Sequence, residues 1–293
     1  MTPPAPATTF DPETGPETPS GKGHRDENFP VGSFLLPAEL RPCVAAFYAF
    51  VRAADDIADN GALDPQDKLE RLEAMDQALI GAPGFDGPGY AKAHNLRAAL
   101  DARGVTDRHA RDLLRAFRRD ARQLAYKDWD DLMSYCEQSA NPVGRFLLDL
   151  HGEASSDYPA SDALCSALQV LNHIQDCGED HAELNRVYIP EDWMTRAGVT
   201  REGLAEPRLS AGMRAVLDQM LEATDRLVVQ ARTLPGRLTS RRLAMESAII
   251  VELAARLSKR LRRGDPLARR VKLSPLDFVG AGVIGAAKGA LRR

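Results

Sequence analysis

The residues best suited to chemistry are two sets of carboxylates, each spaced to lie along one face of a helix. The first set lies in FYAFVRAADDIAD, residues 47–59. At about 100° per residue, positions 48, 52, 55 and 59 fall within a strip about 60° wide. Tyr48, Arg52, Asp55 and Asp59 therefore share a face, which apolar residues flank.

The second set lies in NHIQDCGED, residues 172–180. Asn172, Asp176 and Asp180 follow an i, i+4, i+8 row, and Glu179 is close beside it. Each predicted helix thus presents a DxxxD pair.

Both pairs need compensation, because carboxylates at i and i+4 repel one another and negative charge is unfavourable near a helix C-terminus. Water and dissolved salt are enough to offset this repulsion for one exposed pair. Two pairs in otherwise apolar helices favour divalent cations, and Mg²⁺ commonly combines one or two carboxylates with phosphate oxygens and water. The chemistry that follows is metal-assisted departure of diphosphate.

Composition limits the partners. The chain of 293 residues has a net charge of −4, which argues neither for nucleic acid nor for a strongly acidic partner, and we expect no nucleic-acid partner. Its basic segment, residues 256–272, is typical of a solvated helix face, or of contact with anionic lipid or a phosphorylated substrate. The four cysteines form no CxxC pair, so we expect reduced thiols in the cytoplasm. No signal-peptide core and no apolar run of about 18 residues is present.

Helical signals repeat along the chain and strand-like alternation is absent, which predicts an all-α single domain. Residues 1–23, rich in Pro and Thr, are expected to form a disordered tail, and residues 24–275 the folded domain. We expect helices over roughly 37–60, 64–80, 90–103, 106–125, 128 onward with a break at Pro142, 161–180, 208–233 and 237–263. A short apolar and basic helix, residues 276–293, is predicted either to pack on the domain or to contact a membrane surface peripherally.

Three segments make the chain similar to the squalene/phytoene synthase family: FYAFVRAADDIAD, YCEQSANPVGRFLL and LNHIQDCGEDHAELNRVYIP. The resemblance extends from about residue 24 to about residue 272. It implies an all-α isoprenoid-synthase bundle with a central apolar cavity and a site for diphosphate and Mg²⁺.

The resemblance also implies roles for particular residues. Arg52 matches an arginine that contacts diphosphate, with Tyr48 one turn earlier. The implied metal ligands are Asp55, Asp59, Asn172, Asp176 and Asp180, and the implied substrate-binding residues, besides Arg52, are Asn28, Phe29, Tyr135, Arg186 and Arg270.

Departures from the family pattern favour one branch of it. Residues 139–145 read SANPVGR where members that join two prenyl diphosphates usually have a VAGxVG-like segment, and Gln175 replaces their usual arginine. With the DENFPV opening, residues 26–31, these features resemble members that ionise presqualene diphosphate and capture the rearranged cation with water. Such members need no NADPH, and the sequence has no GxGxxG dinucleotide motif. The expected neighbours in the reaction sequence are an upstream presqualene diphosphate synthase and a downstream reductase.

Several assignments stay open at this stage. Asn141, beside the break at Pro142, is a candidate for orienting the attacking water, although an ordinary helix kink explains the same residues. Gln175 is a candidate for control of rate or product. His24 and His173 are candidate bases, although His173 is as readily a hydrogen-bonding neighbour of the Asp row.

The nearest alternative function is a prenyl transferase that makes presqualene diphosphate or phytoene. A non-catalytic scaffold relative is the alternative of another class, and the two intact DxxxD pairs argue against it.

Overall fold

The computed structural model describes residues 15–18 and 36–291 of the chain, with side chains described as far as residue 285. Of the proposed tail, residues 1–23, only residues 15–18 are described, and the candidate residues His24, Asn28 and Phe29 also lie outside the described residues. Residues 15–18 contact the first helices: the Thr18 hydroxyl donates to the Asp56 carbonyl at 3.3 Å, and Arg71 donates to the Pro16 carbonyl at 3.0 Å.

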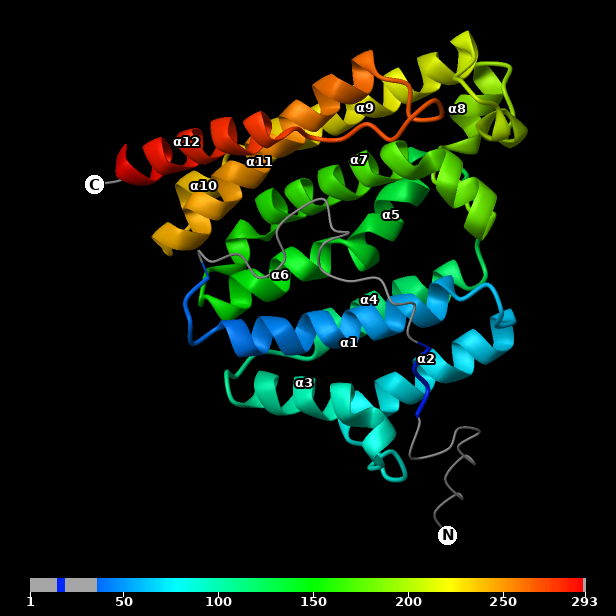
Figure 1. The fold of residues 1–293 in the computed structure, drawn as a ribbon. Helices are drawn as coiled ribbons and strands as arrows, with labels where there is room; N and C mark the ends of the chain where they lie inside the picture. The colour runs from blue at the N-terminus through cyan, green and yellow to red at the C-terminus, as the bar shows by residue number, and fades with distance from the viewer. Residues whose placement is uncertain (1–14, 19–35, 292–293) are drawn as a thin grey trace. The chain divides into compact units, whose positions relative to one another are not determined.

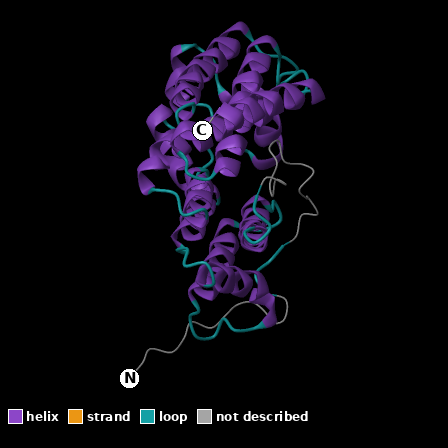
Figure 2. Ribbon diagram, turned by 90° about the vertical axis from the view of Figure 1, so that its left-hand side faces the viewer, coloured by secondary structure: helices purple, strands orange, loops and turns teal. Residues whose placement is uncertain are grey.

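The described chain consists of helices joined by loops, which confirms the predicted all-α fold (Figure 2). Within the described residues, strand-like pairing is limited to one isolated bridge between Ala125 and Val187. The helices form two compact units, residues 1–122 and 123–293. The first contains α1 (Arg41–Asp59), α2 (Pro65–Ile80), α3 (Ala91–Asp101) and α4 (Arg108–Asp120). The second contains α5 (Trp129–Ser139), α6 (Asn141–Leu150), α7 (Tyr158–Leu184), α8 (Glu191–Arg196), α9 (Ala211–Ala231), α10 (Leu234–Arg237), α11 (Arg241–Arg263) and α12 (Pro275–Leu291).

Local signals explain most helix ends. The Asp64 side chain accepts from the Asp67 amide at the start of α2, and Gly81 ends that helix in the left-handed conformation with φ of 75°. Asp128, Ser210 and Ser240 accept from backbone amides in the same way at the starts of α5, α9 and α11. The predicted break near Pro142 is the boundary between α5 and α6, where Pro142 occupies the first turn of α6.

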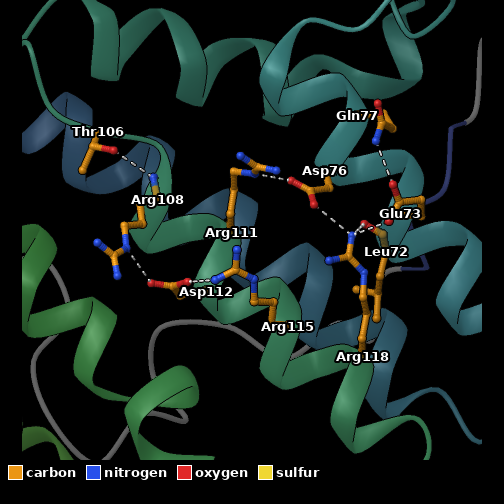
Figure 3. Close-up of polar contacts among 10 residues, drawn as sticks. All are labelled: Leu72, Glu73, Asp76, Gln77, Thr106, Arg108, Arg111, Asp112, Arg115 and Arg118. Carbon is orange, nitrogen blue, oxygen red and sulfur yellow. Dashed lines mark hydrogen bonds and ion pairs between the residues drawn. The ribbon is translucent and has the colours of Figure 1, made fainter.

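In the first unit, α1 packs against α2, α3 and α4, with Phe50 and Ile57 fully buried. Ion pairs link α4 to α2 (Figure 3). The Asp76 carboxylate accepts from Arg111 Nε at 2.8 Å and from Arg118 Nη2 at 3.1 Å. Because Asp76 is 7% exposed, these charge-assisted bonds fix the position of α4 beside α2.

In the second unit, α7 packs against α5, α6, α9 and α11. The last helix, α12, lies along α11, as Figure 1 shows. It is 17 residues long and begins and ends within two residues of the expected range 276–293. Gly280 and Gly285 allow this close approach: a Cβ at Gly280 would lie 2.9 Å from the Arg256 guanidinium, and one at Gly285 2.4 Å from Ile249. Packing thus supports a glycine-rich helix that propensity alone would shorten.

All four cysteines are free, as predicted, and three of them are buried. Among the described residues, no helix combines the length and apolarity that crossing a bilayer requires.

Candidate active site

The acidic face of α1 is held together by Arg52. Its Nη2 and Nε donate to Asp56 Oδ1 at 2.8 and 3.1 Å, and its Nη1 lies 3.2 Å from Asp55 Oδ2. Burial would lower the pKa of the Arg52 guanidinium, but the neighbouring Asp55 and Asp56 outweigh burial and raise it. The structure therefore pairs Arg52 with Asp55, which lies on the same predicted face, and with Asp56, which is outside the four positions of that face.

The Asp55 carboxyl is in an environment that disfavours its charge. Burial, followed by repulsion from Asp59, raises its pKa to about 8, and Arg52 offsets only part of this. Asp120, near the end of α4, adds a further repulsive charge. A bound cation is the natural counterion for such a cluster.

The sequence did not indicate Asp120, which is 5% exposed. It follows a basic stretch, RAFRRD, and has no i+4 acidic partner, so no spacing signal marks it. Its nearness to α1 comes from the packing of α4, and is a tertiary effect.

The acidic face of α7 is also paired with an arginine. Arg270 Nη2 donates to Asp176 Oδ2 at 3.0 Å, and Arg270 Nη1 lies 3.6 Å from Glu179 Oε2. Burial raises the pKa of Asp176 to about 6, assisted by Asp180 and opposed by Arg270. Arg270, assigned from the sequence to phosphate binding, thus contacts a predicted metal ligand.

One oxygen of Asp176 remains open. Its Oδ1 is buried and has no hydrogen-bond partner among the described residues. A buried carboxylate oxygen without a donor is costly, and a hard cation satisfies it. The donor chemistry of α7 therefore fits Mg²⁺.

Each of the two acidic faces, on α1 and on α7, offers few metal ligands. Within the described part of the chain, no group of three or more His, Cys, Asp or Glu side chains is arranged to hold an ion. Mg²⁺ that is held by one or two carboxylates, with phosphate and water completing its shell, does not require such a group.

Gln175 is anchored in the interior of the second unit. It is 3% exposed, and its Nε2 donates to the Val271 carbonyl at 2.5 Å. The segment 264–272 lies close to α7 here, because a Cβ at Gly178 would come within 2.9 Å of Leu267. Gln175 therefore fixes the backbone next to Arg270.

An aromatic cluster adjoins the acidic face of α7. The His173 and Tyr188 rings stack with centroids 3.5 Å apart, and Tyr135 lies 5.6 Å from Tyr188 and 5.1 Å from Tyr126. Burial lowers the pKa of His173, Asp180 opposes this, and nearby Arg186 adds to the lowering. His173 is therefore a buried, stacked residue whose charged form is disfavoured, which suits a neighbour of the Asp row.

The α5–α6 boundary contains one unsatisfied hydroxyl. Asn141 Oδ1 accepts from the Ser166 hydroxyl at 2.9 Å inside the unit. The buried Ser139 Oγ has no hydrogen-bond partner within the described chain. Of the two residues, Ser139 is the one with an open polar atom, whereas Asn141 also joins α6 to α7.

Comparison with known proteins agrees with this fold and these residues. The squalene/phytoene synthase family model matches residues 23–277, and the chain belongs to that family. A hydroxysqualene synthase of Rhodopseudomonas palustris is 45% identical over 260 residues, covering 89% of this chain and 88% of the relative. A 15-cis-phytoene synthase of Paracoccus is 28% identical over 270 residues, covering 88% and 86%. The crystal structure of squalene synthase HpnC from Alicyclobacillus acidocaldarius has 31% identity and a TM-score of 0.69, covering 80% and 87%.

Proposed function

We propose that this protein is a hydroxysqualene synthase, which converts presqualene diphosphate and water to hydroxysqualene and diphosphate. The observation that carries the proposal is the pairing of each carboxylate face with an arginine, Arg52 on α1 and Arg270 beside α7. Such sites suit a phosphorylated substrate, because arginine binds phosphate and carboxylates bind its cation. The 45% identity to a hydroxysqualene synthase supports the choice of reaction.

The residues that would hold Mg²⁺ are Asp55 and Asp59 on α1, and Asn172, Asp176 and Asp180 on α7. The raised pKa values of Asp55 and Asp176 and the open Asp176 Oδ1 support these ligands. Bound Mg²⁺ supplies stabilisation of the charge that develops on the departing diphosphate.

The two arginines would bind the diphosphate directly. Each is already partly withdrawn from solvent, with side-chain exposures of 23% for Arg52 and 34% for Arg270. Phosphate oxygens accept from guanidinium groups as these carboxylates do, and can bind both arms of the guanidinium fork. Arg186, which is buried near His173 in the second unit, is the third proposed substrate-binding arginine.

Aromatic faces and polar groups would then direct the carbocation that remains after diphosphate departs. Tyr48 is partly buried on the α1 acidic face, and its phenol contributes to the raised pKa of Arg52. Tyr135 belongs to the buried aromatic cluster and would present a π face to positive charge. For water capture we propose Ser139 and Asn141, because both are polar residues at the boundary between α5 and α6, and the buried Ser139 Oγ has no hydrogen-bond partner among the described residues. Loss of alcohol formation in Asn141→Ala or Ser139→Ala, with diphosphate release kept, is the expected result.

The proposed partners follow from the reaction. Presqualene diphosphate must come from a synthase that joins two farnesyl units, and the alcohol product must be consumed by a reductase. We propose that the reaction takes place in the cytoplasm, which suits four free thiols.

The test is to incubate purified protein with presqualene diphosphate and Mg²⁺ in ¹⁸O-labelled water, without NADPH. A labelled C30 alcohol is expected, and Asp176→Asn should lower kcat at least about a hundredfold, the scale typical of lost transition-state charge stabilisation. Asp218→Asn, an exposed carboxylate on α9, is the matched control and should keep full activity. Consumption of farnesyl or geranylgeranyl diphosphate instead would make the protein a prenyl transferase. Inertness towards all three substrates would favour the scaffold.

A further inference from the structure

A basic groove lies between the end of α11 and the segment that leads into α12. It encloses about 660 Å³, and its lining includes seven Arg or Lys side chains but a single carboxylate, Asp277. Such a density of one charge sign creates a strong local potential that attracts anions.

Much of this charge is not neutralised by the protein. Arg260 pairs with Asp277 at 2.6 Å, Arg256 pairs with Glu252 and Asp277, and Arg270 pairs with Asp176. The other four basic side chains form no ion pair with any described residue; they are Lys259, Arg263, Arg269 and Lys272. The groove can therefore bind an anion from outside the chain.

An apolar stripe runs along the solvent side of α12. Leu276, Val279 and Val283 stand at i, i+3 and i+7, so they share one face of the helix. Their exposed fractions are 79%, 64% and 65%. Scattered exposed apolar residues are ordinary, but a stripe of three on one helix is a contact surface.

The stripe and the groove belong to one surface because α12 begins at the groove. Ser274 N and Oγ donate to Asp277 Oδ2 at 2.8 and 2.7 Å, which caps the first turn of α12. Asp277 also accepts from Arg260, so the cap ties α12 to α11 at the groove wall. Leu276 and Val279 lie one and two residues from this anchor.

We infer that α12 and the basic groove form a docking surface for an anionic lipid bilayer. The stripe enters the boundary of the acyl chains, while the four unpaired cations contact headgroup phosphates. Amphipathic helices with flanking Lys or Arg bind membranes by this combination. A free anion would use the groove and leave the stripe exposed, and a second copy of the chain would use the stripe and leave the charge uncompensated.

The experiment is vesicle sedimentation of the full chain. The vesicles contain either phosphatidylcholine alone or phosphatidylcholine mixed with phosphatidylglycerol, at low and at high salt. We expect binding to the anionic vesicles only, weakened by salt. Val279→Ser with Val283→Ser should abolish it, and Lys259→Gln with Arg263→Gln should weaken it by about fivefold per charge removed.

The controls are matched in chemistry. Val229→Ser removes a valine that is 66% exposed on α9, and Arg232→Gln with Arg242→Gln removes the same charge from exposed positions elsewhere in the second unit. Both control variants should sediment as the unaltered protein does. Turnover of detergent-dispersed substrate should be unchanged in the stripe variant, so that lost binding is separated from lost folding.

Three results would overturn the inference. One is equal sedimentation of the stripe variant and the Val229→Ser control. Another is an absence of vesicle binding with tight binding of inorganic phosphate, which would make the groove a site for a free anion. The third is concentration-dependent dimerisation that the stripe substitutions abolish, which would assign the surface to a second copy. Because sedimentation does not depend on turnover, failure here is distinct from failure of the proposed reaction.

Discussion

Replacing Gln175 by methionine tests whether the second unit positions Arg270 through a single buried hydrogen bond. Methionine keeps the length and apolar volume of the side chain but removes the NH₂ group that donates to the Val271 carbonyl. Both residues are nearly inaccessible, with exposed fractions of 3% and 8%, so water does not easily replace the lost donor. A buried carbonyl left without a donor costs about 1–3 kcal/mol.

The lost hydrogen bond can lower either the free energy of unfolding or the affinity for diphosphate, and both can be measured. If the segment 264–272 keeps its position, the free energy of unfolding falls by about 1–3 kcal/mol. If the segment moves to hydrate the carbonyl, Arg270 leaves Asp176, and the affinity for inorganic diphosphate with Mg²⁺ falls. The assays are urea unfolding, hydrogen exchange of the amides of residues 271–273, and calorimetric titration of diphosphate.

The control is Gln230→Met. Gln230 is exposed and donates to the Pro159 carbonyl at 3.1 Å, where water is an adequate substitute. Its replacement should change the free energy of unfolding by less than about 0.5 kcal/mol. The positioning role of Gln175 is refuted if Gln175→Met matches this control in stability, exchange and diphosphate affinity.

Three further predictions follow from charges. In Mg²⁺-free buffer, the free energy of unfolding should fall as pH rises from about 4 towards 8, because the pKa of Asp55 is raised from 3.8 in the unfolded chain to about 8 in the folded protein. Asp55→Asn should remove this loss and raise the metal-free melting temperature, measured by calorimetry. Thermal stabilisation by Mg²⁺ should be larger at pH 8 than at pH 6, because Asp55 and Asp176 must release protons to bind it, and a flat profile would contradict their role. Asp277 has a lowered pKa, because the hydrogen bonds that it accepts from Ser274 and Arg260 outweigh burial, so its contribution to stability is lost as pH falls through that pKa. Asp277→Asn should lower the free energy of unfolding by about 1.5–3 kcal/mol and speed hydrogen exchange of the amides of residues 278–283. Unaltered exchange would show that the cap does not hold α12.

Local chemistry explains how much of the fold was predictable. The start of α2 follows from Asp64 and Pro65, and its end from Gly81, so sequence and structure agree to within a residue. The start of α7 is Tyr158 rather than Ser161, because Pro159 fits the first turn. Its end is Leu184, because Asn185 adopts the left-handed conformation and its amide donates to the Asp180 carbonyl.

The features of the site that escaped the sequence are those set by tertiary packing. The spacing along α1 and α7 marked Asp55 and Asp176, because i, i+4 periodicity is local. Asp120 approaches α1 only through the packing of α4, and Gln175 meets Val271 across 96 residues of chain. No periodic pattern encodes such contacts, because they form only when distant segments of the chain pack together.

The ion pair between Arg270 and Asp176 has a consequence for how substrate binding responds to salt. The guanidinium occupies one carboxylate oxygen, so it already serves as a resident counterion. A diphosphate that binds Arg270 displaces the Asp176 carboxylate. It would displace only dissolved salt ions if Arg270 had no partner within the protein. Fewer salt ions are then released than the number of cations suggests, so affinity should decline more gently with ionic strength than simple charge counting implies.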